Sequence, residues 1–284
     1  MADSPTMRRR RLARELARLR EERGMTIREA AVALEWDPSK LSRVEGLQRG
    51  IIVRDVRRLL NLYQVTNEAQ REALFEMARQ AKQRGWWQAY ADVMPSEYAT
   101  LIGMEAEAAE IRTWQPDLVH GLLQTEDYAR AVIRAGRRGD TAAEVDRRVE
   151  IRMTRQQILN RPDPPRVRVV LNEGAVRRVV GGPEVMRTQL RELAAERDRD
   201  TVMIQVLPFT AGEHPAMASG PFDMLQFAQA ADRGVVTLET MTGSLSLESE
   251  TELRQYEKAF DFLQAAALGP RQTRDMLISL AGQI

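Results

Sequence analysis

The chain reads TIREAAVALEWDPSKLSRVE at residues 26–45, and this stretch decides how its N-terminal part folds. Thr26 is a capping residue, and the small apolar residues after it recur at the spacing of one helix face. Asp37 and Pro38 start a second helix, because a carboxylate caps the first amides and proline is tolerated at the first position. The pattern predicts two short helices joined by a tight turn, which is the form of a helix-turn-helix that enters the DNA major groove.

The second of these helices has one buried and one outward face. Leu41 and Val44 point to the core, while the outward side chains are short, polar or basic. On a DNA-reading helix they would meet bases or phosphates, whereas on an ordinary bundle helix they would only be solvated. The candidate DNA-binding residues are Thr26, Ser39, Lys40, Ser42 and Arg43, together with Arg8, Arg9 and Arg10 near the N-terminus.

The charge of the chain is unevenly distributed. Residues 1–90 contain 19 Lys or Arg and 12 Asp or Glu, a net charge of +7 within a whole-chain charge of +1, so the remainder carries −6. A basic end suits a polyanion, because each neutralised phosphate releases counterions. The arginine run at residues 8–11 is interpreted as a flexible DNA-contacting arm or the first turn of a helix, with a solubilising N-terminus as the alternative.

These residues carry a family resemblance. The segment RLARELARLREERGMTIREAAVALEWDPSKLSRVEGLQRGIIVRDVRRLLNLY, residues 11–63, resembles the Cro/repressor-type helix-turn-helix domain of the XRE family, in the WxxSKLSRxE form of actinomycete regulators. Three later segments resemble the C-terminal domain of WhiJ-like, antitoxin-like regulators. They are GWWQAY at 85–90, GMEAEAAEIRTWQPDL at 103–118 and GLLQTEDYARAV at 121–132.

The resemblance implies roles for individual residues. Ser39, Lys40, Ser42 and Arg43 would face base edges or flanking phosphates, and Arg43 is the best candidate for a bidentate contact to guanine. Glu45 would be a structural acid at the end of the recognition helix. The resemblance also implies a homodimeric transcriptional regulator, a repressor or antitoxin-like factor, that binds double-stranded DNA and works with a small BldB-like partner protein.

Three positions depart from the family pattern. Ile27 stands where relatives usually have a phosphate-contacting glutamine. Glu35 occupies the turn position usually held by glycine, at a cost of about 1 kcal/mol if the left-handed geometry is kept. Pro38 replaces a side chain able to donate to a base. These departures leave open an alternative class, a protein-interaction adaptor whose helix-turn-helix no longer reads DNA.

Whole-chain properties limit the class of protein to which the sequence can belong. The 284 residues exceed one typical domain and include no cysteine, so a disulfide framework and a thiolate metal site are excluded. The sequence shows no membrane-spanning apolar run and no signal peptide. We therefore expect a cytoplasmic, nucleoid-associated protein without membrane contact.

The chain is expected to divide near residue 85, into a helix-turn-helix domain at 1–84 and a regulatory, partner-binding domain at 85–284. Asn67 and Gln70 form a capping pair for a helix over about 68–83. Trp86, Trp87 and Tyr90 follow. Base stacking is one reading of these aromatics, but no basic groove surrounds them, and packing that couples the two domains is favoured.

The predicted fold class is α+β, with an all-α five-helix domain followed by a mixed α/β domain. Residues 96–160 are predicted to be helical, with a capping box at Thr141 and Glu144. Five strands then form a mixed sheet with flanking helices. The predicted strands are 166–171, 201–207, 222–227, 235–241 and 244–248, with helices over 183–196 and from Ser249 to Gly269–Pro270.

The sequence offers little for catalysis. His120 and His214 are far apart and lie in no metal-ligand spacing, nucleophile elbow or phosphate loop. The acids Glu105, Glu107 and Glu110 are read as solvated groups on a helical surface. We therefore predict no enzyme, no catalytic residue, no cofactor and no metal, and assign the second domain to control by a partner, with a small-molecule-responsive regulator as an alternative.

Overall fold

The computed structural model describes residues 5–47, 49–81, 85–195, 199–229, 232, 234–240 and 243–284. The chain forms two compact units, Met1–Gln88 and Ala89–Ile284. The expected boundary at residue 84 falls on residues 82–84, which lie outside the described residues, so it stays a prediction. The described part contains no helix that is both long and apolar enough to cross a membrane.

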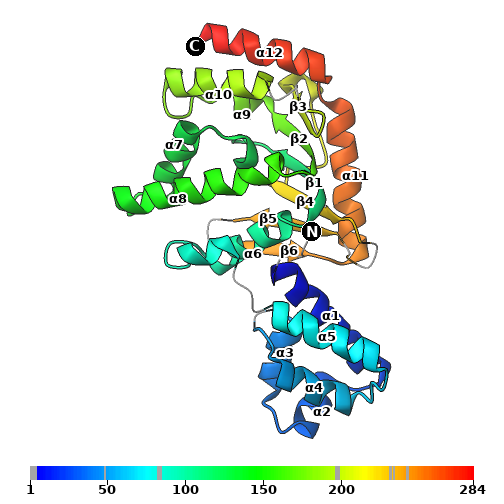
Figure 1. Cartoon of the computed structure of the whole chain (residues 1–284). Helices are drawn as coiled ribbons and strands as arrows, with labels where there is room; N and C mark the ends of the chain where they lie inside the picture. Colours follow the sequence, from blue (N-terminus) through cyan, green and yellow to red (C-terminus); the bar gives the residue numbers. More distant parts are fainter. Residues whose placement is uncertain are drawn as a thin grey trace. The chain divides into compact units, whose positions relative to one another are not determined.

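The first unit is helical, as predicted. Its α-helices, in the described residues, are α1 (Pro5–Glu22), α2 (Ile27–Ala33), α3 (Pro38–Glu45), α4 (Val53–Leu62) and α5 (Glu68–Gln80) (Figure 1). Their apolar faces meet in one core. Leu16 of α1, Leu41 of α3 and Leu59 of α4 are fully buried in it. Burial of such side chains supplies about 1.5–3 kcal/mol each, so the core holds short helices that would be marginal alone.

Local signals explain where α2 and α3 begin. The Thr26 hydroxyl accepts a hydrogen bond from the Glu29 amide (3.2 Å), and the Glu29 carboxylate accepts one from the Thr26 amide (2.8 Å). Asp37 accepts from the Ser39 amide at 2.7 Å, and Pro38 is the first residue of α3. The predicted caps of both helices are confirmed, and they fix the start of the second helix directly after the turn.

The two departures that bear on this fold are accommodated. Glu35 has φ 55°, so the turn keeps the left-handed conformation that glycine adopts freely. Ile27 is half-buried and packs against the core of the unit. The position therefore contributes apolar contact in place of a polar side chain.

The second unit is a mixed sheet with helices. Its strands are β1 (Ala108–Gln115), β2 (Arg166–Asn172), β3 (Val202–Leu207), β4 (Phe222–Phe227), β5 (Val235–Glu239) and β6 (Ser244–Leu247). Its α-helices in the described residues are α6 (Ser96–Glu105), α7 (Glu126–Gly136), α8 (Ala142–Arg155), α9 (Glu173–Arg177), α10 (Pro183–Ala195), α11 (Glu250–Ala266) and α12 (Pro270–Gln283). Its short 3₁₀ segments are η2 (Gly121–Leu123), η3 (Gln156–Asn160) and η5 (Phe209–Ala211), and η1 (Trp86–Tyr90) spans the boundary between the two units.

The strand order of the sheet is β3-β2-β1-β4-β5-β6. β1, β2 and β3 run parallel, and β4, β5 and β6 form an antiparallel meander joined to β1. The five predicted strands are present as β2 to β6, with β5 and β6 ending one or two residues earlier than predicted. The prediction that residues 96–160 are helical was wrong over β1. This strand lies in the middle of the sheet, and its mixed burial does not show the regular alternation of a half-exposed strand. The sheet consequently has six strands where five were predicted.

The two faces of the sheet carry different helices. α11 contacts β1, β3 and β5, and Phe260 of α11 packs with Trp114 and Phe222 in an apolar core. Figure 1 places α7 and α8 on the other side of the sheet from α11. Thr113 and Asp223 are neighbours in the β1–β4 register and alternate with Trp114 and Phe222, so they face this second side.

Candidate nucleic-acid interface and buried polar cluster

Arg43 is the most accessible basic residue of the predicted reading helix. It lies in the last turn of α3 and is exposed, as are Ser39 and Ser42. Its Nε donates to the Ser39 carbonyl oxygen (3.1 Å), and its Nη2 donates to the Ser39 hydroxyl (3.0 Å). These bonds hold the guanidinium along α3 while leaving donors for a ligand, because a guanidinium carries five N–H groups.

Lys40 is held much more tightly than its neighbours. Its Nζ lies 2.8 Å from Oδ2 of Asp55 on α4 and 3.6 Å from the centre of the Trp36 ring. The Lys40 side chain is 22 % exposed and that of Asp55 is 9 % exposed. Lys40 therefore joins α3 to α4 in the free protein, and a DNA contact by this ammonium would have to share it with Asp55.

The other candidate residues lie outside α3. Thr26 is exposed at the start of α2, with its hydroxyl engaged in the capping box. Arg8, Arg9 and Arg10 lie inside α1, so the helical reading of this run is correct and the flexible-arm reading is wrong. Arg8 and Arg10 are buried, and Arg9 is half-buried.

Contacts that the sequence did not predict hold the turn in place. Trp36 is buried, and the Arg58 guanidinium lies 5.5 Å from its ring centre. Arg58 also donates to the Leu34 carbonyl oxygen (2.5 Å), which satisfies one of the free carbonyls at the end of α2. The sequence offered one signal for this contact, which is Trp36, the tryptophan of the WxxSKLSRxE pattern. A large aromatic side chain buries much apolar surface, so a packing role could have been predicted for it.

A second unexpected contact joins α1 to α3. Arg20 and Glu45 form a two-point ion pair, with Nε–Oε1 at 2.9 Å and Nη2–Oε2 at 2.8 Å. Arg20 also donates to the Met25 carbonyl oxygen (2.7 Å), and its pKa is raised by the hydrogen bonds to Glu45. Glu45 is thus bonded within the protein, as expected for a structural acid.

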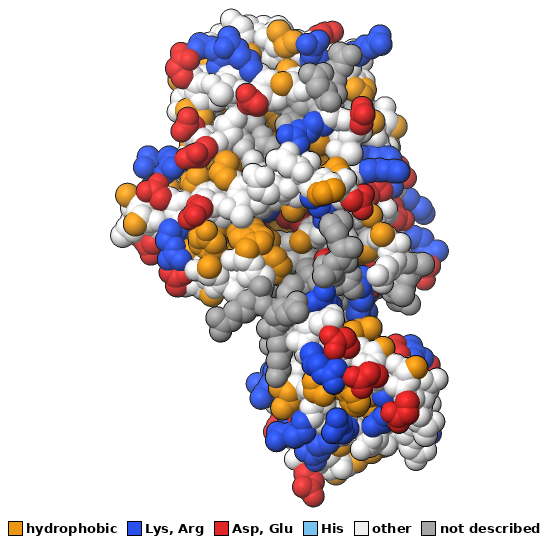
Figure 2. Space-filling model, in the orientation of Figure 1, with side chains coloured by type: hydrophobic (Ala, Val, Ile, Leu, Met, Phe, Trp, Pro, Cys, Tyr) orange, Lys and Arg blue, Asp and Glu red, His pale blue; other side chains and the backbone are white. Residues whose placement is uncertain are grey.

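The electrostatic character of the two units differs on the face drawn in Figure 2. Basic side chains gather on part of the smaller unit, which also shows several acidic ones, and acidic and basic side chains are interspersed on the larger unit. This agrees with the uneven charge of the sequence. An excess of basic side chains provides the attraction to a phosphate backbone that does not depend on base sequence.

The second unit contains a buried polar cluster on the α8 side of its sheet. The members are Glu105, Thr113, His120, Arg155 and Asp223, all at most 6 % exposed. Arg155 of α8 makes two 2.6 Å hydrogen bonds to the carboxylate of Glu105, and it also donates to the Tyr98 hydroxyl (2.9 Å). Glu105 is therefore a buried ion-pair partner, and its interpretation as a solvated surface acid was wrong.

The other two acids of that interpretation are also not on a helix surface. Glu107 is half-buried after the end of α6. Glu110 lies on β1 and forms ion pairs with Arg112 (3.2 Å) and Arg168 (2.9 Å). The error has one cause, because reading 96–114 as a single helix placed all three acids on a helical surface.

His120 and Asp223 complete the cluster. Nε2 of His120 lies 3.4 Å from Oδ1 of Asp223, and the Leu122 amide donates to Nδ1 of His120. A ring nitrogen that accepts a hydrogen bond carries no proton, so the pattern assigns the proton to Nε2, which faces Asp223. Burial alone would raise the pKa of Asp223, but hydrogen bonds from His120 and Thr113 and the positive charge of Arg155 lower it below its usual value.

The cluster also has the composition of a metal site, because ligand atoms of Glu105, His120 and Asp223 lie within 4.8 Å of one another. The bonding does not suit a cation. Both oxygens of Glu105 are taken by Arg155, whose positive charge would repel a metal, and Nε2 of His120 carries a proton. Burial disfavours the charge on Arg155, yet Glu105 raises the pKa of Arg155 well above its usual value, so this cation persists. The arrangement is a closed ion-pair network that ties α6 and α8 to the sheet.

Comparison with known protein families covers both units. A family described as a helix-turn-helix domain matches residues 11–74. A family described as Domain of unknown function (DUF5753) matches residues 98–279, more than half of the chain. The chain belongs to the DUF5753 family. Neither curated proteins nor solved structures gave a match. The helix-turn-helix assignment indicates a DNA-binding regulator rather than an enzyme.

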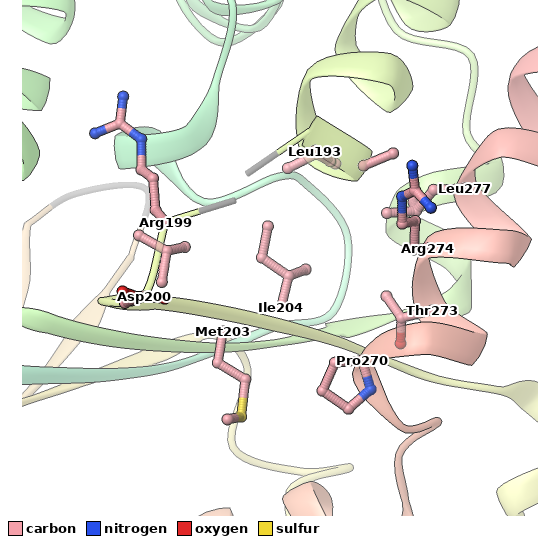
Figure 3. A pocket seen from close by; sticks show the side chains of 11 residues that line it. Leu193, Arg199, Asp200, Met203, Ile204, Pro270, Thr273, Arg274 and Leu277 are labelled. Carbon is pink, nitrogen blue, oxygen red and sulfur yellow. The ribbon is translucent and has the colours of Figure 1, made fainter. Parts of the chain in front are cut away.

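The DUF5753 domain contains a cavity of about 220 Å³ beside the edge strand β3. Figure 3 shows side chains of α10, β3 and α12 around it, including Leu193, Ile204 and Leu277. Arg199, Asp200 and Arg274 also line it, and the Arg199 guanidinium donates to the Leu159 carbonyl oxygen (3.3 Å) and to Oδ1 of Asn160 (2.8 Å). An apolar cavity with a few polar groups is the usual form of a small-molecule site.

Proposed function

We propose that this DNA-binding regulator is a transcriptional repressor or antitoxin-like factor that reads an operator as a homodimer. The observation that carries the proposal is the exposed, helix-aligned guanidinium of Arg43, at the end of a capped helix whose entry turn is fixed by Trp36 and Arg58. A rigid support favours specific reading, because a fixed helix loses little entropy on binding. Ser39, Ser42 and Thr26 would add polar contacts beside it.

Dimerisation is proposed from the geometry of DNA. Regulators with this motif bind two half-sites one helical turn apart, so that protein and operator share a two-fold axis. The chain would therefore protect a palindromic site. Lys40 would contribute to affinity through a flanking phosphate, since its ammonium stays partly exposed beside Asp55.

Control is assigned to the DUF5753 domain. The resemblance to WhiJ-like regulators supports a small BldB-like protein as the partner, and the net charge of −6 outside residues 1–90 would suit a partner with basic surface. The resemblance to the XRE family and to actinomycete regulators supports the same role. Nucleoid association would follow from DNA binding.

The experiment measures the affinity of the intact chain for DNA fragments selected from a random pool and for random duplex, at several salt concentrations. We expect a sequence preference that Arg43→Ala reduces by about 1–3 kcal/mol, with unchanged thermal stability. Arg18→Ala is the matched control, because Arg18 is an exposed arginine on α1 that pairs with Glu15 and Glu22. Absence of any preference at every salt concentration would refute the proposal and favour a protein-interaction adaptor.

The cavity beside β3 favours a second candidate, a regulator that responds to a small molecule. Its apolar lining and the guanidinium of Arg274 suit an apolar ligand with an anionic end. A ligand that binds only the folded state raises the melting temperature. A shift of the melting temperature by a metabolite, abolished by Ile204→Trp, would support this candidate, and a screen without any shift would count against it.

A further inference from the structure

Three neighbouring arginines of the DUF5753 domain have no acidic partner. Arg134 lies in the last turn of α7, Arg137 is the residue after this helix, and Arg138 follows it. All three are exposed, and no hydrogen bond or ion pair of their side chains occurs among the described residues. Other arginines nearby are paired, since Arg130 binds Glu126 and Arg148 binds Asp140. Unlike these two paired arginines, the three at this turn carry charges that no acid of the described residues neutralises.

The three side chains line a hollow rather than a flat surface. A cleft of about 350 Å³ lies between the end of α7 and the start of α8, lined by Arg134, Arg137, Arg138, Asp140, Ala142 and Val145. The carboxylate of Asp140 is the one acid among these lining residues. It is bound by Nε of Arg148 at 2.6 Å, which offsets its charge and leaves the cleft strongly positive.

The start of α8 adds donors to the same cleft. The capping box uses the amides of Thr141 and Glu144, at 2.7 and 3.3 Å. The amides of Ala142 and Ala143 have no hydrogen-bond partner among the described residues. Free amides at the first turn of a fourteen-residue helix attract an anion, because they carry the positive end of the helix dipole.

We propose that this cleft binds a compact phosphate-bearing anion, such as the oligophosphate group of a nucleotide. Guanidinium groups bind phosphate oxygens in pairs, and the cleft presents three of them around a space that such a group fills. A long polyanion suits the place less, because a cleft of about 350 Å³ holds a compact group rather than an extended chain. The site lies in the DUF5753 domain and does not depend on the proposed DNA reading.

The test is a calorimetric titration of the intact chain with inorganic tripolyphosphate at physiological salt. We expect saturable binding of one ion per chain, weakened at least tenfold in the triple variant Arg134→Ala, Arg137→Ala, Arg138→Ala. The control variant removes three other exposed arginines, Arg166, Arg191 and Arg271, with the same change of net charge. It should bind within twofold of the wild type, and circular dichroism should show both variants folded.

Two results would overturn the proposal. Equal weakening in both variants would mean that net charge alone attracts the ion. No binding of tripolyphosphate, combined with a selective loss of affinity for random duplex DNA in the cleft variant, would assign the arginines to a nucleic-acid backbone instead. A smaller loss with the single variant Arg138→Ala than with the triple variant would support a shared site.

Discussion

Arg20 and Glu45, twenty-five residues apart, form a two-point ion pair at 2.8 and 2.9 Å that ties the end of the recognition helix to the first helix of the domain. Both side chains are less than 10 % exposed. Such a pair is costly to break from one side, because Arg20 would stay buried with only its 3.2 Å contact to the exposed carboxylate of Glu21. The position of α3 therefore depends on a residue of α1.

Glu45→Gln is expected to lower the free energy of unfolding by about 3–5 kcal/mol, since Arg20 would keep its charge in a buried site. Urea denaturation followed by circular dichroism measures this loss. Glu22→Gln is the control, because Glu22 pairs with Arg18 at the surface and should contribute less than about 1 kcal/mol. Equal losses in the two variants would show that the Arg20–Glu45 pair has no special structural role.

Lys40→Ala is expected to destabilise the protein as well as weaken DNA binding, in contrast to Arg43→Ala. The substitution leaves the carboxylate of Asp55 nearly buried and without its 2.8 Å partner, a loss of about 1–3 kcal/mol. The double variant with Asp55→Ala should recover part of the stability, because no charge is then left unpaired. Thermal unfolding and affinity measurements on the same samples separate the two effects, and an unchanged melting temperature for Lys40→Ala would contradict the structure.

Glu35→Gly is expected to stabilise the turn. At φ 55° a side chain costs about 1–2 kcal/mol, partly offset by the greater freedom of glycine in the unfolded chain, so a net gain of about 0.5–1 kcal/mol should appear. Ala33→Gly, two residues earlier and at the last residue of α2, should instead cost up to about 1 kcal/mol. Chemical denaturation measures both changes in the free energy of unfolding. A gain for Glu35→Gly with a loss for Ala33→Gly would support the strained turn, and a loss in both variants would reject it.

The buried cluster predicts a dependence of stability on acid. Because the pKa of Asp223 is lower in the folded than in the unfolded protein, its contribution is complete above the unfolded value of about 3.9 and is lost as the pH falls through the folded value. The wild type should therefore lose more stability than Asp223→Asn between about pH 5 and pH 3. Asp261→Asn, at an exposed position, should retain the wild-type profile. Identical profiles for wild type and Asp223→Asn would show that this carboxylate is not the titrating group.

Local signals made the helix-turn-helix predictable from the sequence. These signals are the caps at Thr26 and Asp37, the proline at a helix start and the short apolar spacings. Each acts within a few residues, so it can be read directly from the sequence. The strained conformation of Glu35 could also be predicted, because the residue stands at a turn position with a known geometry. The ion pair of Lys40 was harder to predict, since its partner Asp55 lies on another helix.

The second domain was less predictable because its important contacts are long-range. β1 was taken for helix, since its buried and half-buried residues follow one another without the regular alternation of a half-exposed strand. His120 and Asp223 are separated by about a hundred residues and meet only because β4 pairs with β1. No sequence spacing indicates that such residues meet. The sequence also does not show whether a glutamate such as Glu105 is buried or exposed.

The central place of β1 has a consequence during synthesis of the chain. The strand is made first, but its two neighbours begin at Arg166 and Phe222, so both of its hydrogen-bonding edges stay open while the chain lengthens. Open strand edges recruit other chains, and they are a common origin of aggregation in incomplete proteins. A chain that stopped before Phe222 would keep one of these edges uncovered, so the nascent domain depends on its C-terminal half for solubility.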